Sequence, residues 1–77
     1  MEKFRITIAS LPDRENLVAE ILYNGVQWAE LSQEGKELII QFYSHPRQDY
    51  WKFPLDEAFA ALEEAKKRFI GMGGGRE

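Results

Sequence analysis

The stretch PLDEAFAALEEAKKRFI at residues 54–70 carries the clearest helical period in the sequence. Its apolar residues recur every three or four positions: Leu55, Ala58, Phe59, Leu62, Ala65 and Phe69. This spacing gathers them on one stripe of a 3.6-residue helix, and such a stripe has to be buried. The rest of the chain is therefore expected to supply a surface for this helix.

Both ends of the predicted helix carry suitable residues. Pro54 suits the first turn, where an amide hydrogen would have no partner, and Asp56 and Glu57 suit the positive end of the helix dipole. The basic run at 66–68 suits the opposite end, and Gly71 is expected to close the helix in a left-handed conformation. Two pairs spaced i,i+4 predict a solvated outer face: Glu63 with Lys67 and Glu64 with Arg68.

The chain before this helix predicts antiparallel strands. Alternating apolar residues favour a strand within residues 1–10, and Asn24 with Gly25 is the strongest short hairpin signal. Residues 11–16 read as a loop, and Gly35 as the pivot of a second turn at 33–36. The further strands are expected at residues 17–23, 26 to 31 or 32, and 37–43, with a short extended piece at 50–53 as a possible fifth.

The first hairpin leaves an ambiguity about its faces. A two-residue turn pairs Tyr23 with Val26, and a regular register would then pair Ile21 with Trp28 and Ala19 with Glu30. Both faces of the sheet come out partly apolar in that register. Either a bulge shifts the pairing, or something other than the helix covers the second face.

The expected fold class is α+β, a four- or five-stranded antiparallel meander with one C-terminal amphipathic helix packed on one face. Residues 1–71 are expected to form a single domain, and residues 72–77 a flexible glycine-rich tail. Seventy-seven residues leave room for one core, with about 60% of the unfolded surface buried. A sizeable internal active-site cavity is not expected.

Composition excludes several classes of protein. The chain has no cysteine, so a disulfide framework or thiolate metal site is impossible, and its short apolar runs cannot span a membrane. No signal peptide is recognisable, which makes the cytoplasm the expected location. A net charge of −3 disfavours nucleic acid and favours a basic protein partner.

Catalysis is the weakest interpretation of the residues. The lone histidine, His45, lies in a polar loop near Asp49, but no nucleophile, second acid or anion-binding glycine loop accompanies it. One histidine with scattered carboxylates also lacks the spacing of a metal site. We therefore expect no enzyme activity, no metal and no cofactor.

Aromatic residues raise the alternative of nucleic-acid binding, because exposed rings on an antiparallel sheet can stack bases. Trp28, Tyr43, Tyr50 and Trp51 would form such a platform. The charge around the first hairpin has the wrong sign, although Arg47, Lys52 and the basic end of the helix could form a local patch. The two tryptophans are more simply explained as core.

The acidic hairpin suggests a protein-binding surface. Five glutamates lie between residues 15 and 37: Glu15, Glu20, Glu30, Glu34 and Glu37. They could be only the solvated face of a small sheet. Together with surplus apolar residues such as Leu22, Trp28, Ile39 and Tyr43, however, they indicate an apolar surface with an acidic rim, which would speed capture of a basic partner.

In size, charge and plan, the chain resembles the small immunity proteins that bacteria encode beside polymorphic or contact-dependent toxins. The segments that carry this resemblance are LVAEILYNGVQWAEL at 17–31, ELIIQFY at 37–43, YWKFP at 50–54 and the terminal helix. The resemblance implies a protein that blocks a toxin, commonly a nuclease, by covering its active site. It assigns no individual residue.

These observations predict an inhibitory binding domain whose partner has a basic surface. Glu20, Glu30, Glu34 and Glu37 would supply electrostatic complementarity, and Tyr43, His45, Arg47 and Tyr50 the shaped contacts. Two alternatives stay open. One is a homodimer in which two sheets cover each other, and the other is a nucleic-acid-binding domain.

Overall fold

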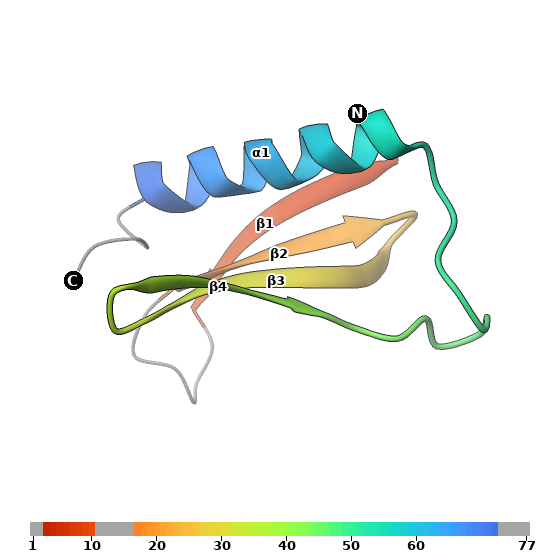
Figure 1. Ribbon diagram of the computed structural model, residues 1–77, viewed down its shortest axis with the longest axis horizontal. Coiled ribbons are helices and arrows are strands. Elements are labelled where there is room, and N and C mark those ends of the chain that lie inside the picture. The colour runs from red at the N-terminus through yellow and green to blue at the C-terminus, as the bar shows by residue number, and fades with distance from the viewer. Residues whose placement is uncertain (1–2, 11–16, 73–77) are drawn as a thin grey trace.

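The computed structural model describes residues 3–10 and 17–72. Four antiparallel strands form one sheet in the order β1-β2-β3-β4, and a C-terminal helix packs on one face (Figure 1). The elements are β1 (Phe4–Ser10), β2 (Leu17–Tyr23), β3 (Val26–Glu34), β4 (Glu37–Phe42) and α1 (Leu55–Gly71). This arrangement confirms the predicted α+β meander. The predicted loop at 11–16 and the tail beyond Met72 lie outside the described residues.

Two tight turns connect the last three strands. Asn24 and Gly25 both have positive φ, at 51° and 80°, as a type I′ turn requires. Gly35 has φ 60° and occupies the first of the two turn positions between β3 and β4, where type II′ turns place glycine. The segment 50–53 is not a strand, so the described sheet has four strands rather than five.

A β-bulge resolves the ambiguity of the first hairpin. Tyr23 pairs with Val26 as expected, but the register shifts between Ile21 and Leu22, so that Ile21 lies opposite Ala29 and not Trp28. A bulge lets two consecutive side chains occupy one face. Trp28 and Ala29 are both buried in the core as a result, while Glu30 moves to the face away from the helix.

The helix buries most of the predicted stripe. Ala58, Ala65 and Phe69 are buried as predicted, and Ala61 is buried in addition. Leu55 and Phe59 are 67% and 61% exposed, so their predicted burial was wrong. The small alanines allow the helix backbone to approach the sheet closely, and Leu62 packs at the margin of the core.

The helix ends also differ slightly from expectation. Pro54 is the residue before the first turn, and its carbonyl accepts a hydrogen bond from the Ala58 amide at 3.1 Å. Gly71 lies inside the helix without a positive φ, so the predicted left-handed closure was wrong; the amide of Met72 instead donates to the Arg68 carbonyl at 2.9 Å. The predicted ion pair between Glu64 and Arg68 is present at 2.9 Å. Within the described residues, no helix is long and apolar enough to cross a membrane.

Candidate functional site

The helix leaves the edge strand β4 uncovered. It contacts β1, β2 and β3, and none of its described residues contacts β4, which is the strand farthest from it (Figure 1). Neighbouring strands lie about 4.8 Å apart and a helix is about 10 Å wide, so one helix covers roughly two strands. The part of the helix-side face formed by β4 therefore has no second layer among the described residues.

Apolar side chains occupy this uncovered part. Phe42 pairs with Ala29 and Ile40 with Leu31, both of which belong to the core beneath the helix. Because side chains alternate along a strand, Leu38, Ile40 and Phe42 all lie on that same face. They are 37%, 40% and 57% exposed.

One flank of the helix adds to this surface. Arg68 Nη1 donates a hydrogen bond to the carbonyl of Ile6 at 3.3 Å, which turns the Arg68 flank toward the β1 edge. At 100° per residue, Leu55 and Phe59 lie on the opposite flank, toward β4. We call three exposed apolar residues of β4 and two from the first turns of α1 the β4 strip: Leu38, Ile40, Phe42, Leu55 and Phe59.

The outer edge of β4 exposes backbone groups as well. The amide of Tyr43 donates to the carbonyl of Trp28 at 2.9 Å, which marks this pair as hydrogen-bonded. Hydrogen-bonded and non-hydrogen-bonded pairs alternate along an antiparallel ladder, so the backbones of Ile39 and Gln41 also form hydrogen bonds with β3. The amides and carbonyls of Leu38, Ile40 and Phe42 then point outward, away from β3. β4 is an edge strand of the described sheet, and such an edge can pair with another strand.

The predicted carboxylates lie on the opposite face. Glu20 and Glu30 are paired across β2 and β3, and Glu34 and Glu37 across the β3–β4 turn. Glu30 is only 3% exposed, and its Oε1 accepts a hydrogen bond from the Tyr43 hydroxyl at 2.8 Å. Glu34 and Glu37 are exposed, and Glu20 is half-buried.

The structure therefore separates the predicted contact residues into groups. Glu34 and Glu37 lie at the turn where β4 begins, while His45, Arg47 and Tyr50 follow its other end. Tyr43 contacts Glu30 on the face of the sheet away from the helix. Trp28 was predicted to contribute apolar surface to that same face, but it belongs to the core between the sheet and the helix. The acidic residues and the loop residues do not form one continuous site.

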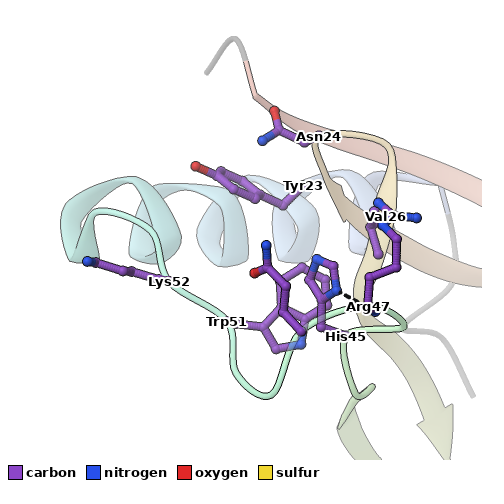
Figure 2. A pocket seen from close by; sticks show the side chains of 8 residues that line it. Tyr23, Asn24, Val26, His45, Arg47, Trp51 and Lys52 are labelled. Atoms are coloured by element: carbon purple, nitrogen blue, oxygen red, sulfur yellow. Dashed lines mark hydrogen bonds between the residues drawn. The ribbon is translucent and has the colours of Figure 1, made fainter.

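The loop after β4 contains a small polar pocket. It is lined by Tyr23, Asn24, Val26, His45, Arg47, Gln48, Trp51 and Lys52. Figure 2 shows His45 beside Trp51 in the loop, Arg47 reaching toward Val26, and Lys52 extending to the opposite side. His45 Nδ1 accepts a hydrogen bond from the Arg47 amide at 3.0 Å, and the His45 ring lies 4.7 Å from the Trp51 ring. Tyr50 is 66% exposed and is not among the lining residues. In the described part of the chain, no group of three potential ligands is placed to hold a metal ion.

Sequence reasoning missed the β4 strip because it assigned Leu55 and Phe59 to the core and looked for surplus apolar surface on the face away from the helix. The width of the sheet relative to one helix was the available signal. The pocket had no comparable signal, since its walls come from segments distant in sequence. No protein-family model matches the chain, and comparisons with curated proteins and with solved structures likewise return no match.

Proposed function

We propose that the protein is a binding domain that captures an amphipathic helix of a partner protein on the β4 strip, and that it acts as an inhibitor of the immunity type. The exposed strip is the observation that carries this proposal: five large apolar side chains from β4 and α1, between 37% and 67% exposed. Burying such a surface is favourable by about 25 cal/mol for each Å² of apolar area.

A helix is the occupant that best matches the geometry. A second helix beside α1 would cover the β3–β4 half of the sheet, as α1 covers the β1–β2 half, and would contact both sides of the strip. A strand added to the β4 edge would cover Leu38, Ile40 and Phe42 but would lie farther from Phe59.

Charge favours a basic partner. Glu34 and Glu37 lie directly opposite each other at the turn where β4 begins, on the face of the sheet away from the strip, and like charges so placed are destabilising. Their negative charge would attract a partner with lysine or arginine residues as it approaches, without direct contact with the helix bound on the strip. Glu30, being buried against Tyr43, supports the sheet and has no direct contact role in this proposal.

The inhibitory role is supported by the resemblance to small bacterial immunity proteins. The test starts from the gene directly upstream: if it encodes a secreted protein with a toxin domain, binding of that domain is measured by calorimetry and by growth rescue in cells that express it. We expect Phe59→Asp to abolish binding and the Glu34→Lys, Glu37→Lys double variant to weaken it, mostly through slower association. Tyr50→Asp is the matched control, because Tyr50 is equally exposed but lies outside the strip.

Either of two results would refute this function. One is an upstream gene that encodes no toxin-bearing protein. The other is binding that Phe59→Asp leaves unchanged.

A homodimer is the second candidate, favoured by the symmetry of β4. Antiparallel pairing of two β4 strands about Ile40 would place Leu38 opposite Phe42 of the other copy and would satisfy the outward backbone groups of all three residues. Such pairing buries the edge and leaves Phe59 outside the interface.

Proline substitutions separate the two candidates. Ile40→Pro removes an outward amide and should abolish a β4–β4 dimer without breaking the β3–β4 ladder, whereas Ile39→Pro removes an inward amide and should destabilise the fold. Sedimentation equilibrium at micromolar concentrations is the measurement. A chain that is monomeric before any substitution excludes the dimer.

A further inference from the structure

The two ends of the β4 strip differ in how much apolar surface they leave open. Leu38 and Ile40 are 37% and 40% exposed, whereas Phe42, Leu55 and Phe59 are 57%, 67% and 61% exposed. β4 and α1 run in opposite directions along the sheet, so β4 ends at the same end of the sheet at which α1 begins (Figure 1). The three most exposed residues therefore lie toward one end, which we call the loop end of the strip.

Ring contacts beneath the strip support this placement. Phe53 lies two residues before α1, and its ring centroid is 4.8 Å from that of Trp28. The Trp28 ring is in turn 5.4 Å from the ring of Phe42. Trp28 is only 8% exposed, so Phe42 rests on a buried ring while most of its own surface stays open. A side chain supported in this way loses less entropy when a partner binds.

The spacing along β4 suits three anchor residues on a partner helix. Leu38, Ile40 and Phe42 follow one another at every second position, which on a strand means steps of about 6.8 Å. Residues i and i+4 of a helix are about 6.0 Å apart along its axis. A helix laid along β4 thus places residues i, i+4 and i+8 above these three side chains, and one terminal anchor lies at the loop end.

The anchor at the loop end has two phenylalanine neighbours. No described residue of α1 contacts β4, so a helix seated between the two elements would touch Phe42 on one side and Phe59 on the other. Aromatic pairs gain energy from tilted and edge-to-face contacts in addition to the area that they bury. Large aromatic anchors also dominate the energetics of many interfaces. Leu38 and Ile40 offer no ring and are better covered already, which suits aliphatic anchors.

We propose that the partner helix carries an aromatic residue at one end of its apolar stripe, and that this residue packs between Phe42 and Phe59. Aliphatic residues four and eight positions away would then cover Ile40 and Leu38. This inference rests on the proposed capture of a helix by the β4 strip, and it adds which residue of the partner makes the strongest contact.

The test uses four alanine-based helical peptides of about sixteen residues, each with three anchors spaced i, i+4 and i+8. Phenylalanine is the first anchor, the middle anchor, the last anchor or absent, and leucine fills the other anchor positions. Binding to the full chain is measured by NMR titration. We expect one of the two peptides with a terminal phenylalanine to bind at least fivefold more tightly than the all-leucine peptide, and the peptide with the middle phenylalanine to gain less than twofold.

Variants of the chain locate the contact. Phe42→Leu and Phe59→Leu keep the strip apolar, and each should reduce the fivefold gain to less than twofold, because a double-mutant cycle isolates the contact between two side chains. Leu38→Ala is the matched control: it should weaken all four peptides and preserve the gain, since Leu38 lies at the opposite end of β4 from Phe42.

Two kinds of result would overturn the inference. Equal affinities of the four peptides, a largest gain from the middle anchor, or a gain that survives both phenylalanine variants would reject the aromatic anchor and leave helix capture standing. Binding of none of the peptides at millimolar concentration would reject helix capture, and the inference with it.

Discussion

Ile21 on β2 and Ile40 on β4 have the same side chain and lie on the same face of one sheet, but their environments differ. Ile21 is fully buried under α1, and Ile40 is 40% exposed. The strand pattern orients both residues correctly, since alternation decides which face a side chain occupies. It does not decide whether another layer covers that face. The same contrast holds within α1, where Phe69 is fully buried and Phe59 is 61% exposed.

The two phenylalanines of α1 give the largest expected effect. Phe69→Ala should destabilise the fold by about 3–5 kcal/mol, because it leaves a cavity in the core. A domain of this size has about 4–12 kcal/mol in total, so the variant should be largely unfolded or close to it. Urea denaturation followed by circular dichroism measures this. Phe59→Ala is the control and should cost much less; an equal cost would show that Phe59 is covered in solution.

The two isoleucines test the comparison directly. Ile21→Ala should cost about 2–5 kcal/mol. Ile40→Ala should cost only about 1–2 kcal/mol, because part of the Ile40 side chain, 40% of its surface, is already in contact with water. Both values come from urea midpoints at two protein concentrations. A large and concentration-dependent cost at Ile40 would mean that a second copy covers β4.

The buried alanines of α1, Ala58, Ala61 and Ala65, test how closely the helix packs against the sheet. Ala61 is fully buried, so Ala61→Leu should destabilise the fold by about 1–3 kcal/mol through overpacking. Ala60 is the next residue and is exposed, and Ala60→Leu should change the stability by less than about 0.5 kcal/mol. Thermal unfolding compares the two variants. Similar melting temperatures would contradict the close packing of α1 on the sheet.

The smallest expected effect concerns the loop that connects β4 to the helix. Trp51→Phe keeps an aromatic ring but removes the hydrogen bond to the Tyr43 carbonyl, which should cost about 0.5–1.5 kcal/mol. Tyr50→Phe in the same loop should leave the stability unchanged, and a Trp51→Phe variant that is equally stable would show that the hydrogen bond to the Tyr43 carbonyl is not needed.

Much of the fold was predictable because its signals are local. The Asn24–Gly25 turn depends on two residues that tolerate positive φ, and the alternation in β1 and the period of α1 each need only a short window. The bulge at Trp28 was foreseen only as one of two possibilities. Whether the bulge or the regular register forms depends on which of the two buries more apolar surface between the sheet and the helix, and the sequence of one strand does not show this.

The candidate sites were less accessible to sequence reasoning. From the sequence, Glu30 is indistinguishable from the exposed glutamates of the first hairpin. In the structure it is buried, and the hydroxyl of Tyr43, 13 residues away, donates a hydrogen bond to it. His45 and Arg47 were singled out as loop residues, whereas Asn24 became part of the same pocket only because the loop folds back onto the β2–β3 turn. Contacts of this kind depend on loop closure and leave no periodic trace in the sequence.

The sequence by itself determined the order of the four strands and the helix, the first hairpin turn and the alternation of side chains along the regular strands. These follow from backbone sterics and from the periods of strands and helices, which act over a few residues. Only the tertiary structure decided where α1 sits across the sheet, and with it which apolar residues are core and which remain open to a partner. The reason is that a single helix is narrower than a four-stranded sheet. The buried alanines of α1 and the hydrogen bond from Arg68 to β1 place the helix toward the β1 edge and away from β4.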